Sequence, residues 1–375
     1  MTTNLIVNLG LVLIFFCVLI APLRLKKVEE NLELFLFLNG VIALTLAGFA
    51  TLPGEVSGWR WEIVLEALVS PVRIVDVYGI PIGIVQMVLL AGLAIYYSHT
   101  YLEQAVEWGV RKSSMPVMVF LLIVLLGLVS SIISAIIAAI LLVELICVLP
   151  LRRTETVKVI VIACFSIGLG AALTPLGEPL STIAVSKLAG EPYNAGFWYL
   201  LSTLGYLILP GVLACGLLGM VVVKRGRLKT DPACCPVTRE TLRDIGIRAA
   251  KVYLFIMALV FLGEGFKPLI ITYIVHAPAE LLYWINMASA ILDNATLASA
   301  EIGPALTPLQ IKSALIGLLA AGGMLIPGNI PNIIAAGKLN ISSKEWAKIG
   351  VPLGLVAMAL YFAVIFLPGY FGFSG

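Results

Sequence analysis

The chain has few charged residues and almost no histidine. Of its 375 residues, 12% are charged and 61% are hydrophobic, and the only two histidines are His99 and His276. A soluble domain of this length needs a far more polar surface, so the composition predicts a polytopic α-helical membrane protein. Two histidines also exclude a histidine-rich metal centre, including that of an intramembrane metalloprotease.

Several motifs are missing as well. The sequence has no G-x-x-x-x-G-K phosphate loop, no G-x-S-x-G nucleophile motif and no CxxC pair. We therefore expect no enzyme activity, no cofactor and no ATP-driven transport by this chain alone. The net charge of +3 comes mostly from short basic loops, which is an orientation signal in membranes and predicts no nucleic-acid partner. We interpret the cysteines in apolar segments as small apolar residues, namely Cys17, Cys147, Cys164 and Cys215.

Apolar runs of about 20 residues predict the membrane spans. In the first 114 residues, which we interpret as a scaffold, they fall at Asn4–Leu23, Leu32–Leu52 and Ile80–Tyr97. We expect an interfacial or half-spanning helix at 62–77 and an amphipathic surface helix at 99–113. Later spans are predicted at Met115–Leu128, Phe197–Val223, Tyr253–Tyr273 and Val351–Leu367.

Basic loops set the expected orientation. The loops at 151–158, 224–251 and 338–348 hold most of the Lys and Arg and fall on one side of the membrane in this count of spans. That side is predicted to be cytoplasmic. Residues 224–252 would form a basic loop followed by an amphipathic helix. Glu264 and Lys267 are three residues apart, so they are expected to pair on one helix face.

Two apolar helices are interrupted in the same way. The first break lies in 170–188 and the second in 322–339, and each holds two prolines in the pattern P-x-x-x-P. Proline removes a helix hydrogen bond, and exposed backbone groups are tolerated at membrane depth only where protein or water surrounds them. The residues expected to form the breaks are Pro175, Gly177, Pro179, Pro327, Gly328 and Pro331.

The matched breaks indicate an internal repeat. Both segments end in Lys-Leu, and Ser134-Ala135-Ile136 upstream of the first matches Ser289-Ala290-Ile291 upstream of the second. Repeat 1 is predicted at 115–223, with a re-entrant hairpin at 129–150 and a broken helix at 157–188. Repeat 2 is predicted at 253–375, with a hairpin at 281–306 and a broken helix at 311–339. An odd number of spans separates the hairpins, which predicts inverted topology.

Polar residues concentrate near these breaks. A carboxylate inside the membrane costs at least about 2.5–3.5 kcal/mol, so each one is a functional candidate. Asp293 and Asn294 offer the hard oxygen ligands that sodium prefers, and the carboxylate could exchange a proton for the cation. Asp293 could instead act only as a helix N-cap, and Glu178 could do the same for the helix after it. The remaining candidate ligands are Thr296, Ser289, Thr174, Asn329, Asn332 and Ser134, and further proton-coupling candidates are Glu301 and Glu144.

The paired units resemble the ion transporter superfamily, which includes sodium/proton antiporters and divalent-anion/sodium symporters. The resemblance covers about residues 115–370 and is nearest to the branch of putative cation transporters. It is carried by S-x-x-x-D-N-x-T at 289–296 and by the breaks at Thr174-Pro175 and Pro331-Asn332. It implies that two hairpin tips and two broken helices meet at the membrane midplane, and that the protein is a homodimer in the cell membrane.

Two transport functions follow from this resemblance. The leading expectation is a secondary transporter of a small cation, exchanging sodium for protons by alternating access. The alternative is sodium-coupled uptake of a small organic or inorganic anion. The symporters of this family carry Ser-Asn-Thr at both hairpin tips, whereas the first tip here has only serines and the first break holds Glu178. Near the breaks, only Lys187 and Lys338 could attract an anion.

Overall fold

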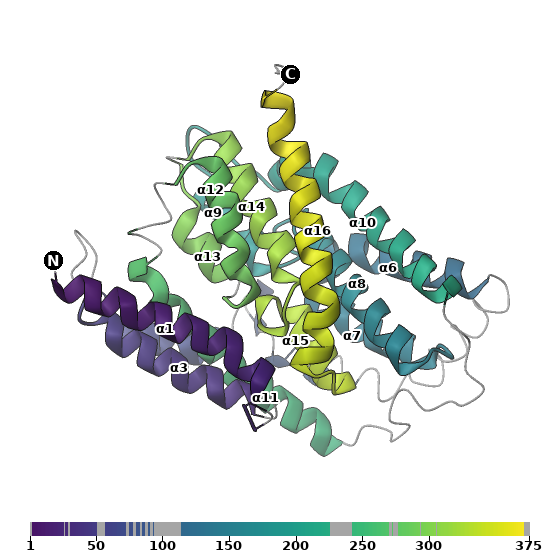
Figure 1. Cartoon of the computed structure of the whole chain (residues 1–375), viewed down its shortest axis with the longest axis horizontal. Coiled ribbons are helices and arrows are strands. Elements are labelled where there is room, and N and C mark those ends of the chain that lie inside the picture. The colour runs from purple at the N-terminus through teal and green to yellow at the C-terminus, as the bar shows by residue number, and fades with distance from the viewer. Residues whose placement is uncertain are drawn as a thin grey trace.

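The protein is a bundle of apolar α-helices (Figure 1). In this computed structural model the description covers residues 2–25, 27–28, 31–50, 57–72, 75–77, 80–82, 85–86, 89–90, 93, 114–225, 242–269, 272, 277–292, 294–304 and 306–370. Within these residues, six helices are long and apolar enough to cross a membrane, which agrees with the predicted polytopic helical class. They contain Asn4–Pro22, Met115–Ile133, Arg153–Ala171, Tyr199–Lys224, Ala249–Leu269 and Ser343–Pro368.

The N-terminal part packs against one later helix. Helix α1 (Thr2–Arg24) lies beside α3 (Leu32–Ala47), and α3 packs closely along α11 (Leu242–Leu269). Gly40 permits this approach, because a Cβ atom there would lie 2.9 Å from the Cβ of Phe261. Glu33, in the first turn of α3, forms an ion pair of 3.7 Å with Lys251 of α11.

The region after α3 differs in part from the prediction. Helix α4 (Trp61–Val69) occupies only the first part of 62–77. It is followed by an antiparallel hairpin of β1 (Val75–Val77) and β2 (Ile80–Ile82), with Val75 opposite Ile82. The predicted span Ile80–Tyr97 is therefore wrong at its start, where backbone pairing overrides the apolar pattern. The rest of that span is mostly outside the described residues, as is the predicted surface helix at 99–113.

In the first half, two helices are joined by a single residue. Helix α6 (Met115–Ile133) ends at Ser134, which has a left-handed φ of 81°, and α7 (Ala135–Val148) follows at once. Residues 129–133 thus belong to α6, and the range 129–150 predicted as a hairpin covers the end of α6 and all of α7. The chain continues through α8 (Arg153–Ala171), α9 (Pro179–Lys187) and α10 (Tyr199–Arg225).

The second half has a similar order of elements. It contains α12 (Ala279–Ile285), the 3-10 helix η2 (Asn286–Ala290), α13 (Asn294–Glu301), α14 (Pro308–Gly322), the 3-10 helix η3 (Ile326–Gly328), α15 (Ile330–Leu339) and α16 (Ser343–Tyr370). Thr307 begins α14 with a capping box to Gln310, which satisfies the free backbone donors of the first turn.

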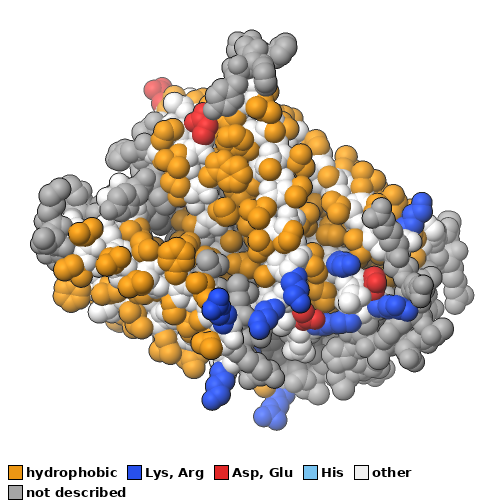
Figure 2. All heavy atoms as spheres, viewed as in Figure 1, with side chains coloured by type: hydrophobic (Ala, Val, Ile, Leu, Met, Phe, Trp, Pro, Cys, Tyr) orange, Lys and Arg blue, Asp and Glu red, His pale blue; other side chains and the backbone are white. Residues whose placement is uncertain are grey.

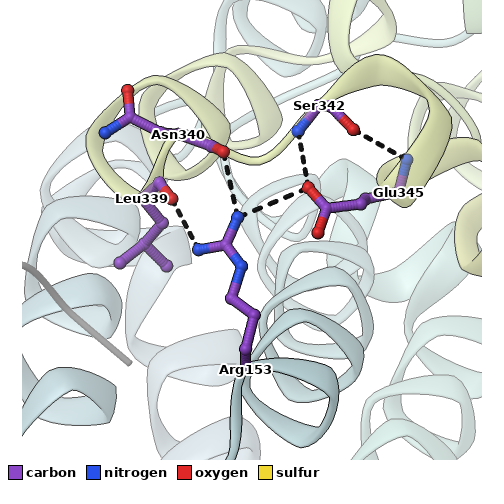
Figure 3. Close-up of polar contacts among 5 residues, drawn as sticks. All are labelled: Arg153, Leu339, Asn340, Ser342 and Glu345. Carbon is purple, nitrogen blue, oxygen red and sulfur yellow. Dashed lines mark hydrogen bonds and ion pairs between the residues drawn. The ribbon is translucent and has the colours of Figure 1, made fainter. Parts of the chain in front are cut away.

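The two interrupted helices, α8–α9 and α14–α15, lie antiparallel. At one end of the molecule, Arg153 at the start of α8 donates to the carbonyl oxygens of Leu339 and Asn340 after α15, at 2.7 and 2.9 Å (Figure 3). At the other end, the hydroxyl of Tyr193, which follows α9, donates to the carbonyl of Leu306, which precedes α14. Each broken helix therefore starts where the other finishes. In between, α9 packs against α13 and α15 packs against α7.

The surface has the polarity of a membrane protein. In Figure 2, hydrophobic side chains cover most of the visible face, and Lys and Arg gather at the end where α8 and α16 begin. Glu264 and Lys267 pair at 3.9 Å as predicted, and Arg60 lies 3.5 Å from the same carboxylate. The exposed large apolar side chains belong mainly to α1, α6, α10 and α16.

The cysteine interpretation holds for three of the four residues. Cys17, Cys164 and Cys215 are free thiols, and Cys164 and Cys215 are buried among apolar side chains. Cys147, near the end of α7, is in a disulfide bond instead. The sequence spacing gave no signal for it, because a disulfide depends on which chain segments meet in space.

Candidate functional site

Both predicted helix breaks are present. The α8 helix ends at Ala171 and α9 begins at Pro179, while α14 ends at Gly322 and α15 begins at Ile330. A proline occupies the first turn of each new half-helix, where its missing N–H costs nothing and its fixed φ favours helix.

Glu178 and Asn329 are the N-cap residues of the two half-helices, although neither side chain forms a cap hydrogen bond. Their extended backbones agree closely, with φ −156° and ψ 158° at Glu178 and φ −154° and ψ 146° at Asn329. The two N-caps are offset by one residue from the alignment that the prolines predict. Matching the prolines pairs Asn329 with Gly177, whereas the structure makes it equivalent to Glu178.

Glycine allows the chain to turn back on itself in both breaks. A Cβ atom at Gly177 would overlap the carbonyl oxygen of Ala171, and one at Gly328 would lie 2.5 Å from the carbonyl oxygen of Gly322. These contacts are far closer than real Cβ atoms adopt. Both glycines immediately precede the N-cap residues, so the shifted register explains why each position needs glycine.

A cavity of about 50 Å³ lies where the breaks meet the starts of α7 and α13. This volume is enough for a few water molecules or a partly hydrated cation. Most of its polar lining was predicted from the sequence. The lining residues are Ser134, Ala135, Ile136, Pro175, Leu176, Gly177, Glu178, Pro179, Leu180, Thr182, Asn294, Ala295, Asn329, Ile330 and Pro331.

Four helices begin at the cavity, namely α7, α9, α13 and α15. Free N–H groups and the helix dipole give each of these ends a partial positive charge. Glu178 places a carboxylate among them and is only 7% exposed. The cavity therefore combines helix ends that favour an anion with a fixed negative group that favours a cation.

The amide of Asn294 is held in place by its neighbours. The hydroxyl of Ser289 lies 3.1 Å from the Leu318 carbonyl oxygen and also within hydrogen-bonding distance of Asn294 Oδ1, while Asn294 Nδ2 has no partner in the described residues. One hydroxyl proton cannot serve both acceptors. Turning the amide by half a turn lets Nδ2 donate to Ser289, which then donates to Leu318. Asn294 Oδ1 is then available as a ligand.

Several predicted ligands hold backbone instead of lining the cavity. Thr174 donates to the Ser131 carbonyl at 2.5 Å and joins the first break to α6. Asn332 donates to the carbonyls of Gly322 and Leu325, at 2.8 and 2.9 Å, and closes the second break. Ser289, Pro327 and Gly328 are also absent from the lining.

Two other predicted positions cannot be placed. Asp293 is outside the described residues, and so is the side chain of Thr296, although its position in α13 is described. One polar residue of the lining was missed from the sequence. Thr182 donates to the Pro175 carbonyl at 2.5 Å. The only signal for it was its place in the first turn of α9.

The other two carboxylates lie outside the cavity lining. Glu144 on α7 forms an ion pair with Lys338 on α15, and both side chains are 11% exposed. This pair connects one half of the molecule to the other. Glu301 at the end of α13 is 3% exposed. Lys187 is exposed near the end of α9 and does not line the cavity.

These features define a membrane-embedded helical protein with a cavity between two broken helices, lined by a few polar groups among apolar ones. The chain belongs to the family described as "Protein of unknown function (DUF1646)", whose sequence model matches residues 8–367. A comparison with curated proteins found no match.

Proposed function

We propose that the protein is a secondary transporter that exchanges sodium for protons by alternating access. The observation that carries the proposal is the buried carboxylate of Glu178, which lines a cavity bounded by two helix breaks. Asn294 and Asn329 add amide oxygens to the same lining. Hard cations prefer such oxygen ligands, and transporters hold ions at discontinuous helices near the membrane midplane.

We further propose that the two halves are inverted repeats of one fold, related to the ion transporter superfamily. Supporting this are the opposite directions of α8 and α14 and the reciprocal packing of α9 on α13 and α15 on α7. In this proposal α6–α7 and α12–α13 are re-entrant hairpins that enter from opposite membrane faces. The protein would reside in the plasma membrane as a homodimer, with the basic end in the cytoplasm.

In the proposed mechanism, Asp293 and Glu178 bind either a cation or a proton. A carboxylate in a poorly hydrated site holds a proton more readily than one in water, so both ions compete for it. Sodium binding releases the proton toward one side, and protonation releases sodium toward the other. The helix breaks supply carbonyl oxygens that replace part of the sodium water shell.

The test is sodium- or lithium-driven proton movement in proteoliposomes. Asp293→Asn should abolish exchange while leaving the protein folded, because the change is nearly isosteric. Glu178→Gln should have a smaller effect and raise the apparent cation constant. Wild-type exchange should fall at acid pH, where protons outcompete the cation. Full exchange in Asp293→Asn would remove Asp293 from the mechanism.

Sodium-coupled uptake of an anion is the second candidate. It is favoured by the four helix N-termini at the cavity, since such ends bind carboxylate and phosphate groups. Glu178 opposes it, because a fixed carboxylate repels an anionic substrate at short range. Accumulation of a labelled dicarboxylate or oxyanion with sodium, without proton movement by any alkali cation, would replace the antiport proposal.

A further inference from the structure

Two acidic residues at related places in the halves have different surroundings. Glu144 lies on α7 and pairs with Lys338 of α15. Glu301 lies on α13, which packs on α9 as α7 packs on α15. Neither carboxyl oxygen of Glu301 has a hydrogen-bond partner, and it forms no ion pair, among the residues that the structure describes.

The neighbour of Glu301 is an amide that also has an unused acceptor. Asn286 of η2 is fully buried and lies next to the Glu301 carboxyl group. Its Nδ2 donates to the Ala314 carbonyl at 3.2 Å, which orients the amide, and its Oδ1 has no described donor. The amide thus offers the Glu301 carboxyl group a second N–H and an acceptor oxygen, but no positive charge.

The charged residues on the packed helices do not supply a counter-charge to Glu301. The helices α9, α11 and α14 pack against α13. On α11, Glu264 and Lys267 pair with each other, and on α14 Lys312 lies 5.1 Å from the ring centre of Tyr206. On α9, Lys187 is exposed and Glu178 faces the cavity. The adjoining η2 contains no titratable residue.

A buried carboxylate without a counter-charge costs several kcal/mol, and such a group takes up a proton instead. A protonated Glu301 has one O–H group, which is the donor that Asn286 Oδ1 lacks. We propose that Glu301 is a proton-binding site separate from the central cavity, occupied by a proton in this conformation and specified by Asn286.

The inference deepens the proposed antiport, on which its transport role rests. Movement of α13 relative to η2 would separate Glu301 from Asn286 and admit water, which lets the carboxyl group ionise. Glu144 differs from Glu301 in having a cationic side chain, that of Lys338, beside it. One half of the molecule would thus hold a fixed ion pair and the other a titrating carboxyl group.

Infrared difference spectroscopy on the full-length protein in liposomes tests the site without any transported ion. Comparing neutral with strongly alkaline pH, the wild type should lose a protonated-carboxyl C=O band. Glu301→Gln should lack that band, and exposed Glu191→Gln should retain it. Asn286→Ala should keep the band but shift its frequency, since the hydrogen bond is gone. A full-strength band in Glu301→Gln, or an unshifted one in Asn286→Ala, would overturn the proposal.

The same variants separate this inference from the antiport proposal. In proteoliposomes, Glu301→Gln should retain sodium–sodium exchange and its fall at acid pH, but lose the change in rate between neutral and strongly alkaline pH. A wild type that moves no cation, with a band that disappears in Glu301→Gln, would refute antiport and support the proton site. If Glu301→Gln keeps both the carboxyl band and the pH dependence of the wild type, the proton site is refuted while the antiport proposal stands.

Discussion

Glu178 and Asn329 occupy the same place in the two broken helices. Each is the N-cap of a half-helix with nearly identical extended backbone, and each lines the central cavity. The two side chains differ mainly in charge. Glu178 carries a carboxylate, whereas Asn329 carries a neutral amide on a side chain that is one methylene shorter. The equivalence allows a carboxylate to be moved from one half of the molecule to the other.

Moving the carboxylate tests whether the charge itself matters. Glu178→Gln should raise the apparent sodium constant about tenfold, equivalent to about 1.4 kcal/mol, because a charged ligand becomes neutral. Adding Asn329→Asp to that variant should recover part of the loss. The measurement is the sodium dependence of proton movement in proteoliposomes. A double variant no better than Glu178→Gln would contradict a shared role of the two N-caps.

The buried ion pair predicts a strong dependence on both partners. Lys338→Met leaves Glu144 buried without its counter-charge, which should lower the free energy of unfolding by about 3–5 kcal/mol. Lys338→Met combined with Glu144→Gln should recover most of that loss. Thermal unfolding in detergent measures the effect, with exposed Lys348→Met as the control. Equal melting temperatures for the single and double variants would argue against the pair.

Gly177, in the turn before α9, is expected to tolerate no side chain, not even the methyl group of alanine. Gly177→Ala would force a Cβ atom onto the Ala171 carbonyl, so we expect a loss of about 1–3 kcal/mol in stability and a loss of sodium exchange. Gly190→Ala is the matched control, since nothing lies within 4 Å of a Cβ atom there. Normal stability and exchange in Gly177→Ala would show that the turn opens at no cost.

The basic end predicts the orientation in the membrane. Lys344 lies at the start of α16 in the basic end, whereas Gly196 follows the loop after α9 at the opposite end. In a variant without native cysteines, Lys344→Cys should react with an impermeant thiol reagent only from the cytoplasm, and Gly196→Cys only from outside. Reversed labelling in intact cells and inverted vesicles would reverse the proposed orientation of the protein.

The sequence by itself determined the class of protein, the two helix breaks and most of the polar cavity lining. These properties depend on local causes, since long apolar runs favour membrane helices and proline interrupts them. Glu178, Asn294 and Asn329 were recognisable because polar residues are rare in such segments.

Only the tertiary structure decided how these pieces meet. It made Glu178, and not Gly177, the counterpart of Asn329, because backbone geometry and glycine contacts fix the register more strictly than prolines do. It assigned Thr174 and Asn332 to backbone support, paired Glu144 with Lys338, and left Glu301 beside Asn286. Partners distant in sequence are chosen by helix packing, and no local pattern records that choice.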